Sequence, residues 1–511
     1  RKRRLMTYRR VSVCAVMASA IVCGMTLSAT AAPVAMAGYS VSVFAPPPNG
    51  ATSPDSIAID RGRVFVGYTD QSIKTGGGTS TIAEFTTTGS LLTTFAVPGH
   101  NDGLKVDPAT HLLWAMSNED GNPQLTIIDP AAGTQTTYNL PSVNGGGLDD
   151  IVFLNGNVYF SVSNPANNPN TDPAIVQATL TNGAFTLTPV IQGNETAINV
   201  LTNTALTLNL QDPDSMTVTP QGNILLDSQA DDQLVTVSSP GSTSQTVNVL
   251  PITINIPAAN KMNNDIDDTV FARSADDVLL EGDLKSNNVI AISGLQPGQP
   301  YSASSDNNLV GALDLSTGIV NPVVTGLNSP HGMALLPVLH TFGSGLQMIA
   351  SPEDFTGISP FDSVNQILAA RDTLNNRYVY SPQAPADALH PTVGYFAFFA
   401  NPVRLFDQGT ATSTLINLQP GWNLIGSPIA TTVPLSALGV TDQAGVGYSD
   451  PGAASRAGVL SPLFYSYSPG DAAYPANYQV HTLPNGTLEP FKGYWVYAFQ
   501  RATLNVAPAV R

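Results

Sequence analysis

The chain has 511 residues, of which 20 are Lys or Arg and 37 are Asp or Glu, so its formal net charge is −17 and only 11% of its residues are charged. This balance excludes a nucleic-acid-binding protein, because phosphate contacts require clustered Lys and Arg. Hydrophobic residues make up 42% of the chain, which is enough to build cores and excludes a wholly disordered protein. The length predicts two or three domains.

The first 37 residues have the composition of a secretory signal. Residues 1–10 contain six of the 20 basic residues, an apolar run follows from Val11 to Leu27, and small residues in A-x-A patterns end at Ala31 and Ala37. These features are typical of a cleaved signal peptide. A permanent anchor is the alternative, but it needs about 20 apolar residues. We therefore predict a signal peptide over residues 1–37 and a protein that is secreted, extracellular or periplasmic.

Removal of this segment changes the composition. The remaining chain has 14 basic residues against 37 acidic ones, a net charge of −23, and both cysteines, Cys14 and Cys23, leave with the signal. Disulfides, thiolate metal sites and cysteine catalysis are thereby excluded. Because no further apolar run is long enough to cross a bilayer, we predict no membrane span after signal cleavage.

Residues 38–337 consist of short Val, Ile, Leu, Phe, Tyr and Thr runs separated by Gly, Pro, Asn and Asp, a pattern typical of antiparallel strands joined by tight turns. One short segment occurs six times, and its second position is occupied in turn by Asp55, Asp102, Asp149, Asp214, Asp267 and His331. The spacings of 47, 47, 65, 53 and 64 residues are close to the roughly 40–50 residues of a β-propeller blade.

The predicted fold class is therefore all-β, with a six-bladed propeller over residues 38–337. A second and a third strand are expected after each start, for the fifth blade at Val278–Leu280 and Val289–Ile292. The sixth start has few strands after it, so Val41–Phe44 is predicted to complete the last blade as its outer strand. A five-bladed ring with one orphan strand is the alternative.

These segments resemble the blade openings of the NHL and gluconolactonase-like group of six-bladed propellers, which begin with Pro-x-Gly and a hydrophobic residue. The segment that starts at Pro330 matches this opening, whereas the other five have Asp at the second position. Related lyases use a histidine in the channel, and the resemblance makes His331 the candidate catalytic residue. Related lactonases bind a metal through a mixed Glu, Asn and Asp set that does not map onto these repeats, so the resemblance does not itself imply catalysis.

The first strand of a propeller blade is the innermost, so the repeated position is expected to face one mouth of the central channel. We predict a ring of five carboxylates there, with His331 as the sixth member. The carboxylates are those of Asp55, Asp102, Asp149, Asp214 and Asp267. Carboxylates at close quarters must raise their pKa values, stay hydrated, accept donors or bind a cation. Ca²⁺, which takes six to eight oxygen ligands, is the expected ion. In the alternative interpretation, each Asp accepts hydrogen bonds from the backbone of its own turn.

No motif of another known chemistry stands out. The sequence has no G-x-S-x-G elbow, H-E-x-x-H helix, P-loop or dinucleotide fingerprint, whose spacings position nucleophiles, metals or phosphates. The remaining histidines occur singly, at His100, His111, His340, His390 and His481. The acidic stretch Asn118–Asn122 lacks the spacing of an EF-hand and is interpreted as a hairpin loop.

A different duplication begins after residue 340. Residues 345–352 match residues 421–428, and residues 389–398 match residues 488–497. We predict a duplicated β-sandwich-like module, with repeats over 341–410 and 418–505, and one helix around Ser363–Leu374. The repeats resemble β-rich modules of secreted bacterial proteins that open with GWNLIGxP and end with KGYWV. Trp422 and Trp495 lie in matching motifs. They form either a platform for sugars or, as we favour, pack in a core or a sheet interface.

The sequence thus predicts an exported, non-catalytic binding or scaffold protein. Its ligand or cation would dock at the acidic mouth of the propeller, and its partner would be a small molecule, a glycan or a component of the cell envelope. The enzyme alternative is a metal-dependent lactonase or lyase, in which a bound cation polarises a carbonyl and a carboxylate or His331 moves a proton. A purely structural envelope protein is the third possibility.

Overall fold

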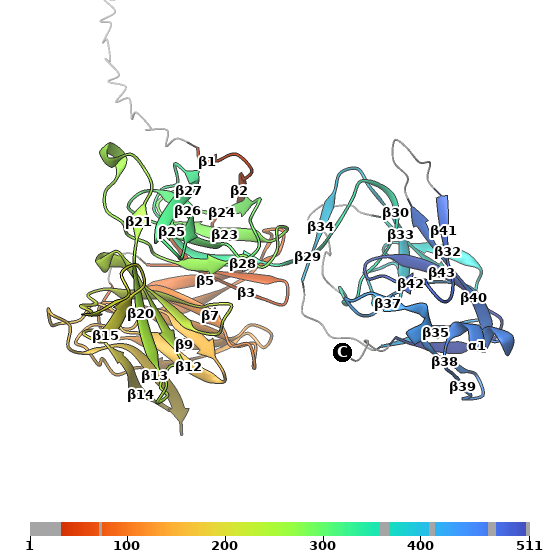
Figure 1. Ribbon diagram of the computed structural model, residues 1–511, viewed down its shortest axis with the longest axis horizontal. Coiled ribbons are helices and arrows are strands. Elements are labelled where there is room, and N and C mark those ends of the chain that lie inside the picture. The colour runs from red at the N-terminus through yellow and green to blue at the C-terminus, as the bar shows by residue number, and fades with distance from the viewer. Residues whose placement is uncertain (1–31, 71–73, 357–366, 408–413, 469–476, 507–511) are drawn as a thin grey trace, which may run out of the picture.

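The computed structural model describes residues 32–70, 74–356, 367–407, 414–468 and 477–506. Figure 1 shows two parts side by side, a ring of small sheets coloured red to green and a C-terminal part coloured cyan to blue. The chain passes from one to the other where β28 (Pro330–Leu336) is followed by β29 (Val338–Phe342). Both parts are built almost wholly of strands, so the predicted all-β class is confirmed.

Blades one to four each follow the chain from the inner strand outward. The first comprises β3 (Pro54–Asp60), β4 (Arg63–Tyr68), β5 (Thr79–Thr86) and β6 (Leu91–Pro98). The second comprises β7 (Asn101–Val106), β8 (Leu113–Ser117), β9 (Gln124–Asp129) and β10 (Thr134–Asn139). The third comprises β11 (Ile151–Leu154), β12 (Asn157–Ser161), β13 (Pro173–Thr181) and β14 (Ala184–Gln192). The fourth comprises β17 (Pro213–Val218), β18 (Ile224–Ser228), β19 (Gln233–Ser238) and β20 (Thr246–Pro251), extended by β15 (Thr196–Asn199) and β16 (Thr204–Thr207).

The last two blades exchange strands. The fifth comprises β22 (Thr269–Phe271), β25 (Pro300–Ser304), β26 (Leu309–Asp314) and β27 (Ile319–Thr325), with β1 (Val34–Ala35) and β21 (Thr253–Ile254) added at its outer side. The sixth comprises β28, β23 (Val278–Asp283), β24 (Asn288–Ser293) and β2 (Ser40–Ala45). The prediction that Val278–Leu280 and Val289–Ile292 belong to the fifth blade is therefore wrong, because this hairpin pairs with β28 of the sixth.

The ring closes with six blades. The inner strands contact one another in the order β3, β7, β11, β17, β22, β28 and back to β3. A separate apolar core fills each of the six boundaries between neighbouring blades, as expected for sheets that bury both faces. The predicted outer strand at Val41–Phe44 is also confirmed, since β2 pairs with β24 from Ser40 opposite Ser293.

The N-terminal residues before β2 also belong to the ring. Val34 of β1 pairs with Thr325 of β27, and the Met36 N–H donates to the Val323 carbonyl over 2.8 Å. Four of the residues assigned to the predicted signal, Val34 to Ala37, thus lie beside the fifth blade.

The C-terminal part contains two four-stranded sheets of the same order. One is β30 (Gly345–Ala350), β33 (Gly394–Phe399), β31 (Leu368–Asp372) and β32 (Arg377–Tyr380). The other is β36 (Gly421–Gly426), β43 (Gly493–Ala498), β40 (Leu460–Ser468) and β41 (Asn477–His481). A strand pair, β29 with β34 (Val403–Phe406), lies beside the first sheet. Beside the second sheet, the pair of β35 (Leu415–Leu418) and β44 (Ala502–Asn505) is extended by β38 (Gly439–Asp442) and β39 (Gly447–Tyr448) into a four-stranded sheet. Each sheet and its strand pair enclose a core of their own.

The two sheets contact each other reciprocally. The Ala350 N–H donates to the Phe491 carbonyl over 3.1 Å, and the Gly426 N–H donates to the Thr392 carbonyl over 3.1 Å. Gly426 lies 76 residues after Ala350, and Phe491 lies 99 residues after Thr392, which are the offsets of the two sequence matches. In an interface with two-fold symmetry, equivalent residues of the two halves form equivalent bonds to each other. The two sheets show this pattern.

Further elements surround the second sheet. They are β37 (Val433–Pro434), β38 (Gly439–Asp442), β39 (Gly447–Tyr448), β42 (Thr487–Leu488) and the short helix α1 (Pro451–Arg456). Asp450 caps this helix, because its Oδ1 accepts a hydrogen bond from the Ala453 N–H at 2.8 Å, as an N-cap side chain does. Three 3₁₀ turns complete the described elements: η1 (Gln229–Asp231), η2 (Ala258–Asn260) and η3 (Leu435–Ala437).

The predicted helix around Ser363–Leu374 is wrong where the structure describes it. Residues 363–366 lie outside the described residues, and Leu368–Asp372 form the strand β31. Leu368 and Ala370 are buried while Ala369 and Arg371 are half-buried, so the true period is two, and the sheet determines the conformation of this short segment.

Among the described residues, none of the helices is long and apolar enough to span a membrane.

Candidate metal site at the channel mouth

The six repeated positions meet at one end of the channel. Asp55, Asp102, Asp214 and His331 are the second residues of the inner strands β3, β7, β17 and β28. The pairing of each of these strands with its neighbour is interrupted beside this residue by a register shift. Such bulges redirect side chains at sheet ends. In the third and fifth blades an Asp-Asp pair precedes the strand instead.

The mouth narrows to a small polar cavity of about 20 Å³, which is space on the scale of one water molecule or ion. Its walls include Asp55, Asp102, Asp149 and Asp267. Asp55, Asp149 and Asp267 are each at most 6% exposed. Most of the predicted carboxylates therefore share one confined, poorly hydrated space.

His100 adds a nitrogen to this ring of oxygens. It lies one residue before β7, and its side chain is buried. Its Nδ1 is 2.8 Å from the backbone carbonyl of Asp70 and 2.8 Å from Thr69 Oγ1. A carbonyl only accepts, so Nδ1 carries the proton and the neutral ring has its free lone pair on Nε2.

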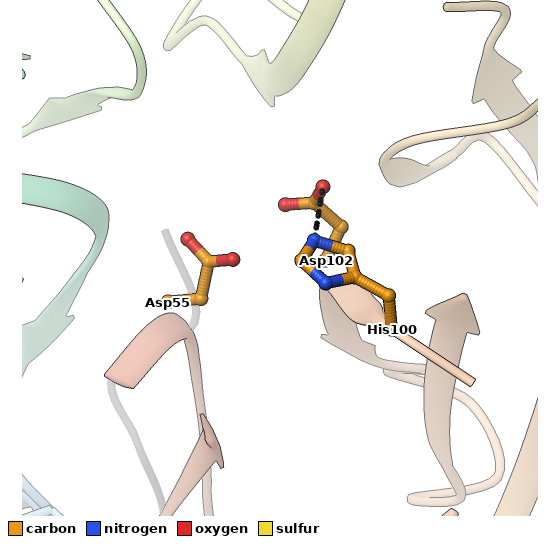
Figure 2. A group of neighbouring side chains, drawn as sticks. All are labelled: Asp55, His100 and Asp102. Atoms are coloured by element: carbon orange, nitrogen blue, oxygen red, sulfur yellow. Dashed lines mark ion pairs between the residues drawn. The ribbon is translucent and has the colours of Figure 1, made fainter. Parts of the chain in front are cut away.

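The Nε2 atom faces carboxylates. His100 Nε2 lies 3.8 Å from Asp102 Oδ2 and 3.6 Å from Glu119 Oε1. Figure 2 shows the side chains of Asp55, His100 and Asp102 gathered from two neighbouring blades. One ligand atom from each of these three residues lies within 4.8 Å of the others, and the same holds for Asp102, Glu119 and Asp149. Asp102 is thus common to two groups with the geometry of a metal site.

The electrostatics of the mouth favour protons or cations. Burial, and then the charges of Asp149, Glu119 and Asp55, raise the pKa of Asp102 well above its ordinary value. Burial and the charge of Asp214 do the same to the pKa of Asp149. Burial alone would raise the pKa of Glu119 too, but hydrogen bonds from Asp102 and Lys74 lower it. Lys74 is ion-paired with Glu119, so Glu119 is already partly neutralised.

The other members of the predicted ring lie apart from His100. Asp214 is hydrogen-bonded to Asp149. Asp267 accepts from Gln229 Nε2 at 2.9 Å, and its Oδ2 lies 3.6 Å from His331 Nε2. Burial raises the pKa of Asp267 to about 7, against the opposing charge of His331. The five carboxylates therefore form neighbouring groups around the opening.

The turn-capping interpretation does not hold for these five side chains. In the described part of the chain, no backbone N–H donates to a carboxylate of the ring. Instead, the second Asp of each Asp-Asp pair accepts a hydrogen bond from a backbone N–H group of the next blade. Asp150 Oδ2 accepts from the Met216 N–H at 2.8 Å, and Asp268 Oδ2 accepts from the Met333 N–H at 2.7 Å.

The sequence prediction missed His100, Glu119 and Lys74. His100 stands two residues before Asp102, so its position next to a repeated channel residue was the available signal. Glu119 follows β8 in the stretch interpreted as a hairpin loop, and this stretch reaches the mouth. Lys74 comes from the β4–β5 connection, where nothing in the repeat distinguishes it.

No family model and no curated protein matches the chain. Similar solved structures include a putative gluconolactonase, at 10% identity over 72% of this chain and 95% of that chain, with a TM-score of 0.35. The periplasmic gluconolactonase of Pseudomonas aeruginosa is similar at 10% identity over 55% and 88%, with a TM-score of 0.33. A catalytically inactive virginiamycin B lyase from Staphylococcus aureus with quinupristin is similar at 12% identity over 58% and 96%, with a TM-score of 0.30.

Proposed function

We propose that the propeller binds a divalent cation at this mouth through Asp55, His100 and Asp102, with Asp149 beside it as a further oxygen donor. The observation that carries the proposal is the tautomer of His100. Its Nδ1 proton is held by the Asp70 carbonyl, and its Nε2 is directed at carboxylates. A buried histidine oriented by a backbone carbonyl is the usual arrangement of a metal ligand.

The nitrogen ligand bears on the identity of the ion. Ca²⁺, the ion expected from carboxylates alone, takes oxygen ligands, whereas Zn²⁺ and Mn²⁺ accept imidazole nitrogen together with carboxylate oxygen. The presence of His100 in the group therefore favours Zn²⁺ or Mn²⁺ over Ca²⁺. Burial, and then mutual repulsion, raise the pKa values of Asp102 and Asp149. A bound ion would offset both effects, because a cation favours the ionised form of its ligands.

We further propose that the bound ion is the docking point of an oxygen-bearing ligand, a small molecule, a glycan or a component of the cell envelope, and that the protein binds it without converting it. The carboxylate-lined cavity of the mouth has only about 20 Å³ of space, so the ligand would approach from outside the channel. This is the role of an exported binding protein.

A second candidate function is a metal-assisted hydrolase or lyase, which the pair of Asp267 and His331 favours. Asp267 has a pKa of about 7, and its Oδ2 lies 3.6 Å from His331 Nε2. Groups that titrate near neutrality are suited to proton transfer. Turnover of a lactone panel that needs metal and is lost in His331→Ala would favour this function, and turnover that survives in His331→Ala would remove His331 from it.

The primary proposal is tested by calorimetric titration of the chelator-treated protein with Zn²⁺, Mn²⁺ and Ca²⁺. We expect one equivalent of Zn²⁺ or Mn²⁺ to bind, and His100→Ala and Asp102→Asn each to weaken binding at least 10-fold. His111→Ala is the matched control, because His111 pairs with Asp60 at the far end of β3. Binding that is unchanged in both mouth variants, or tight only for Ca²⁺, would overturn the assignment of His100 as a ligand.

A further inference from the structure

The C-terminal part has an open groove in which both sheets take part. The groove has a volume of about 580 Å³ and is lined by Arg371, Tyr378, Trp422, Tyr465, Tyr478 and Trp495. These residues come from six different strands, β31, β32, β36, β40, β41 and β43. In Figure 1 most of these strands lie on the side of the C-terminal part away from the propeller. The groove is therefore separate from the channel mouth.

The strand period places the aromatic rings outside. Along β43, Tyr494 and Val496 are buried in the core, and Trp495 between them faces the other side. Trp422 is 43% exposed and Tyr478 is 52% exposed. Tyr494 takes the core position and Trp495 lies on the outer face. Trp495 packs there against Tyr378 and Phe396 of the other sheet, so of the two packing sites expected for the tryptophans it occupies the sheet interface and not the core.

The aromatic rings that line the groove pack against one another. The rings of Trp422 and Trp495 meet edge to face, with centroids 6.3 Å apart and planes 82° apart. Tyr378 and Trp495 meet at 6.3 Å and 79°, and Trp422 and Tyr465 at 5.8 Å and 67°. Edge-to-face pairs are a favoured arrangement of aromatic side chains. A groove walled by mutually supported rings is preformed, so little conformational entropy is lost when a ligand binds.

The chemistry of the lining restricts the ligand. The described residues that line the groove offer flat aromatic faces, phenol hydroxyls, indole N–H groups and a single cation, with no aliphatic and no acidic side chain among them. The guanidinium of Arg371 already stacks 5.7 Å from the ring centroid of Tyr378 and donates to Asn376 Oδ1. One engaged cation in a chain of net charge −17 is a poor match for a nucleic acid or an acidic polymer. A lining without aliphatic side chains is equally poor for an acyl chain.

An uncharged glycan is the ligand class that fits the aromatic and hydroxyl groups of the lining. A sugar ring presents an apolar C–H face, which stacks on an aromatic ring, and hydroxyls at its edge, which bond to phenol and indole groups. The groove volume is within the roughly 300–1,000 Å³ of small-molecule sites, which is enough for a short stretch of a sugar chain. We propose that the C-terminal groove binds a neutral polysaccharide, independently of the metal site in the propeller.

Affinity electrophoresis of the full chain tests this proposal, with hydroxyethyl cellulose, xylan, galactomannan and glycol chitin in the gel. We expect at least one of these polysaccharides to retard the protein. Trp422→Ala, Trp495→Ala and Tyr478→Ala should each weaken the retardation at least 5-fold. Phe398→Ala is the matched control, because Phe398 is 62% exposed on β33, in one of the two sheets that form the groove, but is not among the described residues that line it. Thermal melting of each variant separates loss of binding from loss of folding, and the rim variant Tyr478→Ala is expected to melt like the native protein.

Three outcomes would overturn the proposal. The first is the absence of retardation by all four polysaccharides, and the second is equal retardation of the Trp422→Ala, Tyr478→Ala and Phe398→Ala variants. The third is a concentration-dependent dimer in sedimentation velocity that Trp422→Ala abolishes, which would make a second copy of the chain the occupant. Metal titration of the same variants is expected to be unchanged, so failure of this proposal is distinguishable from failure of the metal site.

Discussion

The imidazole of His100 is fixed by the backbone carbonyl of Asp70, 2.8 Å from its Nδ1. This bond determines the tautomer and leaves Nε2 as the atom that faces Asp102, 3.8 Å away. His331 has the same arrangement, since its Nδ1 lies 2.9 Å from the Ser329 carbonyl and its Nε2 faces Asp267. The mouth thus presents two imidazoles, each oriented by a backbone carbonyl.

The first prediction concerns the group that supports His100. Thr69 Oγ1 lies 2.8 Å from His100 Nδ1 and accepts part of its hydrogen bond. Thr69→Val keeps the shape and removes this acceptor, so the ring becomes less firmly oriented. We expect the Kd for Zn²⁺ or Mn²⁺ to rise about 10-fold, the lower end of the effect of outer partners of metal ligands.

Calorimetric titration measures this Kd, with Thr126→Val as the control. Thr126 is buried in β9 and bonds to Thr137, so its replacement changes a similar hydroxyl away from the mouth. A Kd that is equal in both variants would contradict the role of Thr69.

The second prediction concerns the pH dependence of stability in the absence of metal. Burial raises the pKa of Asp212 and of Asp268 to about 6, and that of Asp267 to about 7. Between pH 4 and pH 7 the folded protein therefore holds more protons than the unfolded chain. The free energy of unfolding then falls as the pH rises through this window.

Two histidines act in the other direction. Burial lowers the pKa values of His340 and His481, so their contribution to stability is lost as the pH falls below their unfolded value. The raised carboxyls outnumber them, and we expect a lower midpoint of urea unfolding at pH 8 than at pH 5.5 in chelator. A higher midpoint at pH 8 would contradict the buried, protonated carboxyls.

The third prediction concerns the bond between neighbouring blades. Asp268 is 4% exposed and accepts hydrogen bonds from the backbone N–H groups of Met333 and Thr269 at 2.7 and 2.8 Å. Asp268→Ala leaves both donors without a partner, which costs about 2–4 kcal/mol of unfolding free energy. Asp268→Asn should cost less, because its amide oxygen still accepts one of the two bonds.

Equilibrium denaturation of the whole chain measures these losses. Asp276→Asn is the control, since Asp276 is exposed in the turn before β23. If Asp268→Ala were no less stable than the control, the bond to the sixth blade would not contribute to holding the ring.

The fourth prediction concerns the contact between the two C-terminal sheets. A Cβ on Gly394 would lie 2.6 Å from the Ile425 carbonyl oxygen, closer than atoms can approach. Gly394→Ala should therefore force the sheets apart and cost about 1–3 kcal/mol. Gly447→Ala is expected to be neutral, because a Cβ there meets nothing within 4 Å. Equal melting of both variants would contradict the close packing of the repeats.

The number of blades could be predicted because each blade begins with the same short segment. Which strand joins which sheet could not be predicted for the last two blades. The apolar runs Val278–Leu280 and Val289–Ile292 identify strands, but pairing with β28 depends on contacts between residues up to 58 positions apart, as between Val278 and Leu336. Ring closure decides this pairing, and no local pattern encodes it.

The site shows the same division. Asp55 and Asp102 were predicted because they occupy the repeated position. His100 was not predicted, because it lies outside the repeated position and has no counterpart in the other blades. Its orientation depends on the Asp70 carbonyl of the preceding blade. The local sequence reports the repeat, whereas a group assembled across two blades depends on how they pack.

The most direct test of the metal site is anomalous diffraction from crystals grown with Zn²⁺ or Mn²⁺. We expect a single strong peak at the channel mouth, about 2.0–2.2 Å from His100 Nε2 and from a carboxylate oxygen of Asp102. A peak elsewhere, or a mouth without a peak while His100 Nε2 carries a proton shared with Asp102, would contradict the central claim.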